Sequence, residues 1–200
     1  MIYINAIIIS TIMLMAGAED GLKVGDKAMD FNLKNIDGSM VSLSGNKEVK
    51  GYILIFTCNT CPYSVAYEDR IIALHSKNAP KGYPVVAVQP NNSKRSPGDS
   101  FEKMQKRAKS KGFPFPYLMD ETQEVTRTYG ATNTPHVYVL NRQSGDSFRI
   151  EYIGAIDNNS RNAAAADKHY VQDAVDNLLE GKSIQTTKTK AIGCTIKWAG

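Results

Sequence analysis

The feature that most constrains this fold is an apolar run at residues 52–56 that leads into Cys58-Asn59-Thr60-Cys61 and then Pro62. Bulky apolar residues on both faces are typical of a central parallel strand. After the second cysteine, apolar residues recur at helical spacing, at Tyr63, Tyr67, Ile71 and Leu74. Proline fits the first turn of a helix, because its missing N–H would have no partner there. The pattern predicts a strand, a turn that carries two cysteines, and a helix.

The two cysteines in this turn are predicted to form a redox dithiol. The first sulfur is expected at the N-terminus of this helix, where unpaired N–H groups and the helix dipole favour thiolate over thiol. We therefore expect Cys58 to be the nucleophile and Cys61, one turn further on, to resolve the mixed disulfide. A structural alternative is a pair of buried, inert cysteines. A zinc site needs two more ligands, and no second close pair exists among the candidates, which are Cys194, His75, His136 and His169. Neither a metal nor another cofactor is expected.

The remaining patterns predict one α/β domain over residues 19–200, with a mixed central sheet flanked by helices. Asp37-Gly38 between alternating residues predicts an N-terminal β-hairpin ahead of the central strand. Asp99, three residues before Glu102, resembles the capping box of a helix. Residues 113–118 contain two prolines, so we expect a bent or edge segment there.

Residues 1–18 have the character of a secretory signal peptide. They carry no charge, contain an apolar stretch at 7–15 and end in Ala16-Gly17-Ala18, which a signal peptidase can accept. A membrane span needs about 20 apolar residues, so no stable span is expected after cleavage. The absence of Lys and Arg is atypical and leaves an uncleaved tether as the alternative. We expect a periplasmic or otherwise extracytoplasmic protein, in a compartment where thiols pair or need a dedicated reductant.

The charged residues of the tail do not indicate a nucleic-acid site. The formal net charge is +4, and the tail lysines are spread among Ser and Thr without interleaved aromatics. A solvated surface explains that pattern. The odd cysteine, Cys194, also lies in this tail. It is either a buried small hydrophobe or a second resolving thiol, or it forms an intermolecular bond.

Several segments together resemble the thioredoxin-like superfamily, and within it the exported redoxin branch related to AhpC/TSA proteins. They are residues 24–31, 58–62, 129–135, 152–157 and the tail 193–198. The resemblance implies a thioredoxin-like fold and a thiol-disulfide oxidoreductase that acts on protein thiols and disulfides, with an electron donor that the sequence does not identify. It also implies a cis peptide at Thr134-Pro135 facing the dithiol. Such a turn would leave the Thr134 backbone free to pair with an incoming peptide.

Two positions depart from the thioredoxin pattern. Thioredoxins usually have Trp before the first cysteine and a buried carboxylate six residues upstream of it, where this chain has Thr57 and Tyr52. A tyrosine with a pKa of about 10 is a poor proton acceptor at neutral pH. Water or Glu68, on the predicted helix, could take that role, although we expect Glu68 to be solvated.

Two other functions fit the same fold. A thiol peroxidase, that is, a peroxiredoxin-like antioxidant, carries threonine three positions before its peroxidatic cysteine; here those positions hold Ile55 and Cys58, which favours disulfide exchange. A copper chaperone typically shows Cys-x-x-x-Cys-Pro and a downstream histidine. The spacing here is one residue shorter, but His136 could still reach the dithiol.

Overall fold

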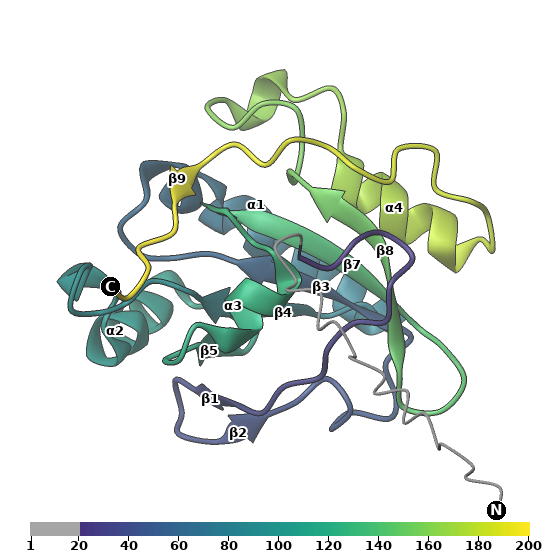
Figure 1. The fold of residues 1–200 in the computed structure, drawn as a ribbon. Helices are drawn as coiled ribbons and strands as arrows, with labels where there is room; N and C mark the ends of the chain where they lie inside the picture. Colours follow the sequence, from purple (N-terminus) through teal and green to yellow (C-terminus); the bar gives the residue numbers. More distant parts are fainter. Residues whose placement is uncertain (1–20) are drawn as a thin grey trace, which may run out of the picture.

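The structure is a computed structural model that describes residues 21–200, so the predicted signal peptide lies outside the described residues. Its core is a seven-stranded sheet with the strand order β2-β1-β5-β4-β3-β7-β8 (Figure 1). The central strand β3, Gly51–Phe56, is buried at every residue. It runs parallel to β4, Val85–Gln89, and antiparallel to β7, His136–Arg142. The predicted mixed sheet is confirmed.

The other elements surround this centre. The remaining strands are β1 (Leu33–Asn35), β2 (Met40–Val41), β5 (Tyr117–Met119), β6 (Asn133–Thr134), β8 (Phe148–Gly154) and β9 (Cys194–Thr195). The helices are α1 (Pro62–Asn78), α2 (Phe101–Lys111), α3 (Glu124–Tyr129) and α4 (Tyr170–Leu179). Within residues 21–200, none of the helices is long and apolar enough to cross a membrane.

The N-terminal hairpin forms where the sequence predicts it. Strands β1 and β2 pair antiparallel around Asp37-Gly38. Gly38 has φ +88°, a conformation that glycine adopts without the steric cost of a side chain. The sequence predicts a bent or edge segment at residues 113–118, but β5, which begins at Tyr117, is an interior strand paired with both β4 and β1. The reason is that the strand begins at Tyr117, after both prolines, so neither interrupts its pairing.

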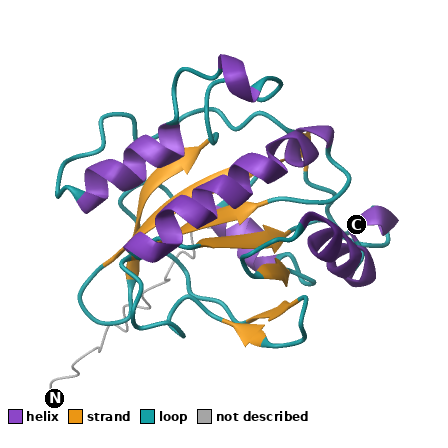
Figure 2. Cartoon of the chain, turned by 180° about the vertical axis from the view of Figure 1, so that it is seen from behind, coloured by secondary structure: helices purple, strands orange, loops and turns teal. Residues whose placement is uncertain are grey.

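Alternate residues of β3 face two separate cores, because side chains alternate along a strand. Ile53 and Ile55 belong to the core that includes residues of α1, α2 and α4, while Leu54 and Phe56 belong to the core with α3 and the N-terminal segment. Figure 2 shows α1 lying across one face of the sheet. This packing fixes β3 and α1, and with them the turn that joins the two elements.

Candidate active site

The turn between β3 and α1 carries Cys58 and Cys61, and the fold brings Cys194 to the same place. All three are free thiols. Cys58 and Cys61 are only 4% and 3% exposed, whereas Cys194 is partly exposed. The sequence predicted that the first sulfur would lie at the helix N-terminus, but the N-cap of α1 is Cys61 and its first residue is Pro62. The helix N-terminus therefore acts on Cys61.

Cys61 is the sulfur best placed to carry negative charge. Its pKa lies below the ordinary value, first because of the neighbouring Cys58 thiol and further because of the Cys194 thiol and the nearby Ser64 and Cys194 backbone, which together outweigh the opposing effect of burial. The Cys194 nitrogen lies 3.4 Å from Cys61 Sγ. The Thr134 carbonyl oxygen, at 3.1 Å, accepts from the protonated thiol and so opposes ionisation. The groups that favour a negative charge on Cys61 outnumber the single Thr134 oxygen that favours the protonated thiol, so the thiolate is favoured.

Cys58 has the opposite surroundings. Its pKa is raised, first because its thiol is the donor to Cys61, then by burial and by the nearby Asp99 carboxylate. The Thr134 hydroxyl, with Oγ1 3.2 Å from Cys58 Sγ, lowers the Cys58 pKa and so offsets part of this rise. Cys58 also lines a void of about 10 Å³, which holds at most a single water. These surroundings place the proton on Cys58 and the negative charge on Cys61, whereas the sequence predicts Cys58 as the nucleophile.

The residues between the cysteines are held by Asp99, which the sequence assigned to a helix cap. Ser100 is the N-cap of α2 instead. Asp99 is fully buried, and its carboxylate accepts only from neutral groups. The donors are Asn59 N, Thr60 N, Thr60 Oγ1, Asn91 Nδ2 and Ser96 Oγ, at 2.6–3.1 Å. Because Asp99 takes the Asn59 and Thr60 N–H groups, these residues stay in a loop and the helix starts later.

Glu68 is buried, not solvated as expected. It is 4% exposed, and the Arg107 guanidinium donates to both its oxygens at 2.7 Å. The Lys111 Nζ lies 3.4 Å from the same carboxylate. Such a bidentate pair is a strong charge-assisted contact, and here it joins α1 to α2. Both oxygens are thus engaged with Arg107, and Glu68 lines the same small void as Cys58.

The Thr134–Pro135 peptide bond is cis, as the resemblance implied. It faces the dithiol, since Thr134 contacts Cys58 through Oγ1 and Cys61 through its carbonyl oxygen. The expectation that the Thr134 backbone is free for an incoming peptide is wrong. Strand β6 pairs antiparallel with β9, with Thr134 opposite Cys194, so the tail already occupies that edge (Figure 1).

Tyr52 and His136 make their hydrogen bonds away from the cysteines. The Tyr52 hydroxyl donates to the Leu43 carbonyl oxygen at 2.8 Å, and burial raises its pKa to about 12. His136 Nδ1 accepts from the Thr132 N–H at 3.4 Å, and burial lowers the pKa of His136 to about 4. In the part of the chain that the structure describes, no group of three or more His, Cys, Asp or Glu side chains is arranged to hold a metal ion.

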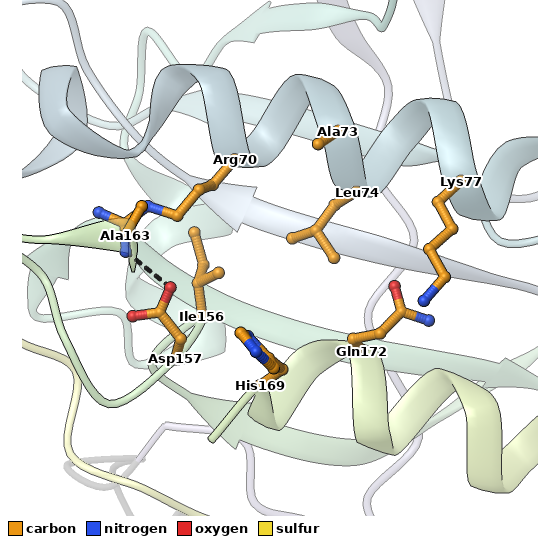
Figure 3. Close-up of a pocket in the computed structure, with 9 residues that line it drawn as sticks. All are labelled: Arg70, Ala73, Leu74, Lys77, Ile156, Asp157, Ala163, His169 and Gln172. Carbon is orange, nitrogen blue, oxygen red and sulfur yellow. Dashed lines mark hydrogen bonds and ion pairs between the residues drawn. The ribbon is translucent and has the colours of Figure 1, made fainter. Parts of the chain in front are cut away.

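A separate pocket of about 340 Å³ lies between α1 and α4, and Figure 3 shows that it is largely apolar at its centre. At one end the Arg70 guanidinium donates to Asp157 at 2.6 Å. Asp157 also accepts from the Tyr67 hydroxyl at 2.8 Å, so it ties α1 to the segment after β8. No cysteine lines this pocket, and its charged groups are engaged in holding the helix.

Comparison with known proteins identifies the family. The profile of the AhpC/TSA family matches residues 24–145. The chain belongs to the AhpC/TSA family. No curated protein matches it. Among solved structures, an uncharacterized conserved protein from Geobacillus kaustophilus is 35% identical to this AhpC/TSA-family chain, with a TM-score of 0.82 over 88% of this chain and 93% of its own.

Two more distant structures share the fold of this AhpC/TSA-family chain. Peroxidoxin BcpB from Mycobacterium tuberculosis is 17% identical, with a TM-score of 0.61 over 81% of this chain and 99% of its own. A putative thiol:disulfide interchange protein DsbE from Chlorobium tepidum is 22% identical, with a TM-score of 0.61 over 80% of this chain and 99% of its own. The thioredoxin-like redoxin fold is thereby confirmed, and membership of the AhpC/TSA family supports a thiol redox function.

Proposed function

We propose that this chain is a thiol-disulfide oxidoreductase that exchanges its Cys58–Cys61 pair with external disulfides. The observation that supports this most directly is the placement of both cysteines against the cis Thr134–Pro135 peptide, with Cys58 Sγ 3.2 Å from Thr134 Oγ1 and Cys61 Sγ 3.1 Å from the Thr134 carbonyl oxygen. Cys61 as thiolate attacks one sulfur of a disulfide, and one thiol leaves. Cys58 then attacks Cys61 Sγ, which forms the Cys58–Cys61 disulfide and releases the second thiol. The reverse order of steps reduces the pair.

We further propose that this exchange takes place outside the cytoplasm, with protein thiols and disulfides as substrates and a separate electron donor. The support is the signal-like character of residues 1–18. Expression of the full chain and measurement of the mass of the recovered protein test this directly. Recovery from the extracytoplasmic fraction without residues 1–18 is expected, and a cytoplasmic protein with an intact N-terminus would contradict it.

The experiment that tests the chemistry is equilibration with glutathione buffers of graded redox ratio. We expect the wild-type chain to pass reversibly between a dithiol and a Cys58–Cys61 disulfide, read by the mass of alkylated peptides. Cys58→Ser and Cys61→Ser should each lose this two-electron couple. A wild-type chain that forms no Cys58–Cys61 disulfide at any ratio would refute the proposal.

Thiol peroxidase activity is the second candidate, and the lowered pKa of Cys61 beside two other thiols favours it. A peroxide would oxidise the Cys61 thiolate to a sulfenic acid, and a neighbouring thiol would condense with it to a disulfide and water. Addition of hydrogen peroxide with dimedone as the trap distinguishes the two. Rapid labelling of Cys61 in the Cys58→Ser, Cys194→Ser double variant would support the peroxidase, and labelling no faster than that of free cysteine would exclude it.

A further inference from the structure

We propose that Cys194 is a third redox thiol, through which the Cys58–Cys61 pair meets an external disulfide. This inference rests on the proposed thiol-disulfide exchange, and it replaces direct attack of Cys61 on the external disulfide with attack by Cys194, which then passes the disulfide to Cys61. It is carried by the place of Cys194 on the Thr134 edge, by its contact with Cys61 and by the difference in exposure among the three thiols.

The first observation is that β9 occupies the edge at which a substrate peptide would add. An extended peptide that binds a sheet edge obtains its affinity from main-chain hydrogen bonds to that edge. Here Thr134 and Asn133 are already paired with Cys194 and Thr195. Cys194 consequently occupies the position that a substrate cysteine would take opposite the cis peptide.

The second observation is how closely the tail lies against that peptide. A Cβ atom on Gly193 would lie 2.1 Å from the Thr134 oxygen and 2.6 Å from the Thr134 carbonyl carbon, so only glycine fits there. The next residue then places its N–H 3.4 Å from Cys61 Sγ. Cys194 also lies opposite Thr134 in the β6–β9 pair, and the Thr134 carbonyl oxygen is 3.1 Å from the same sulfur. Cys61 is thus the middle member of three thiols, with Cys58 on one side and Cys194 on the other.

The third observation is accessibility. Cys58 and Cys61 are nearly fully buried, and the void beside Cys58 is too small for a substrate. Cys194 is partly exposed. With the tail in place, an external disulfide therefore meets Cys194 before it can meet either member of the pair.

The tail is fixed on both sides of Cys194. Before it, the Thr189 N–H donates to the Ile153 oxygen at 3.0 Å. After it, the Lys197 N–H donates to Asn91 Oδ1 at 2.9 Å, and the Arg127 guanidinium lies 4.4 Å from the Trp198 ring centroid. Displacement of β9 by a substrate strand would break contacts at both ends. The substrate class that fits is a disulfide small enough, or protruding enough, to reach Cys194 without strand pairing.

The exchange proceeds through the three thiols in turn, from Cys194 to Cys61 to Cys58. In the reduced state Cys61 is a thiolate, and the pKa of Cys194 is raised to about 11 by burial and by donation to Cys61. Cys194 passes its proton to Cys61 and attacks the external disulfide, and the first thiol leaves with that proton. Cys61 then attacks Cys194 Sγ, releasing the second thiol, which takes the proton of Cys58. Finally Cys58 attacks Cys61 Sγ, forming the Cys58–Cys61 disulfide and leaving Cys194 as a thiolate that takes a proton from water.

A trapping experiment on the full chain tests the middle step. Cys58→Ser is reduced, mixed with oxidised glutathione, quenched in acid, alkylated and mapped by mass spectrometry without reduction. Since the last step is blocked, we expect a Cys61–Cys194 disulfide to accumulate. If glutathione remains on Cys61 while Cys194 is alkylated as a free thiol, the relay is refuted.

A rate measurement tests the entry step. We expect Cys194→Ser to form the Cys58–Cys61 disulfide from oxidised glutathione about tenfold or more slowly than wild type, because the buried pair must then be reached directly. Thr195→Ser, on the same strand, should react at the wild-type rate. The double variant Cys194→Ser, Thr195→Cys should stay slow, because its new thiol points to the opposite side of β9.

The outcomes separate this inference from the function on which it rests. A wild-type rate for Cys194→Ser, or a full recovery of rate by the cysteine at position 195, overturns the relay and leaves the Cys58–Cys61 exchange standing. Failure of the wild-type chain to form a Cys58–Cys61 disulfide with glutathione overturns both.

Discussion

Cys58 and Cys61 are separated by two residues, yet their surroundings are opposite. Cys61 caps α1, accepts hydrogen bonds from thiols and backbone N–H groups, and lies against the tail. Cys58 is a hydrogen donor in a closed site near a buried carboxylate. The Cys-x-x-Cys spacing is the same for both sulfurs, so it cannot decide which one carries the charge. Partners that are distant in the sequence decide it.

The largest expected effect comes from removing one sulfur or the other. Cys61→Ser should slow alkylation of the fastest-reacting thiol by iodoacetamide at pH 7 by about 100-fold or more, because the remaining thiols are protonated. Cys58→Ser should keep a fast-reacting Cys61. Peptide mass spectrometry locates the label in each variant. If Cys58→Ser is alkylated slowly and Cys61→Ser is alkylated rapidly, the negative charge lies on Cys58 and not on Cys61.

The next effect concerns pH. Cys58→Ala removes the donor that contributes most to the lowered pKa of Cys61, so that pKa should rise toward the ordinary value of about 8.5. A thiol loses reactivity as pH falls below its pKa, so the midpoint of the alkylation profile should move to higher pH. Cys58→Ser keeps a hydroxyl donor and should move it less. Equal midpoints for wild type and Cys58→Ala would show that Cys58 does not tune Cys61.

A smaller effect is expected from the carboxylate that holds the turn. Asp99→Asn replaces one acceptor oxygen with an NH2 group, which cannot accept, so either the part-buried N–H groups of Asn59 and Thr60 or the buried Asn91 amide loses its acceptor. We expect a loss of about 3 kcal/mol in the free energy of unfolding, measured with urea. Asp69→Asn, at an exposed position on α1, is the control and should change stability little. A loss for Asp99→Asn no greater than for the control would show that this carboxylate does not fix the turn.

The smallest effect is expected at Thr134. Thr134→Val removes the hydroxyl 3.2 Å from Cys58 Sγ while keeping the shape of the side chain. The pKa of Cys58 should rise further, and the unfolding free energy should change by about 1 kcal/mol or less. The pH profile of Cys61 alkylation should hardly move, because the Thr134 backbone remains. A shift as large as that for Cys58→Ala would mean that the two sulfurs share one environment.

The sequence could predict what is local in this molecule. The strand, turn and helix around the cysteines and the hairpin at Asp37-Gly38 follow from periodicity and turn chemistry over short windows. The role of Asp99 in holding the turn could not be predicted, because its partners Asn59 and Thr60 lie 40 and 39 residues away in the sequence. The burial of Glu68 likewise depends on Arg107, 39 residues further along.

The pairing of β9 could not be predicted for a related reason. Its two residues are too few to show any alternation, so no pattern marks them as a strand. The contact of Cys194 with Cys61 appears only once the sheet and the Thr134–Pro135 turn are in place. The family resemblance suggested a peptide-binding edge at Thr134, and only the three-dimensional structure revealed that the chain's own tail fills it.

The late position of β9 has a consequence for biosynthesis. Domains made on the ribosome fold in order from the N-terminus, at about 5–20 residues per second. Residues 51–78, which form the strand and helix with both buried cysteines, emerge well before Gly193 and Cys194. For the seconds in between, the Thr134 edge lacks its partner and the thiols lack their cover. The Cys58 and Cys61 thiols of a newly made chain therefore gain their cover only when Gly193 and Cys194 reach the Thr134 edge, and the pairing of β9 ends that interval.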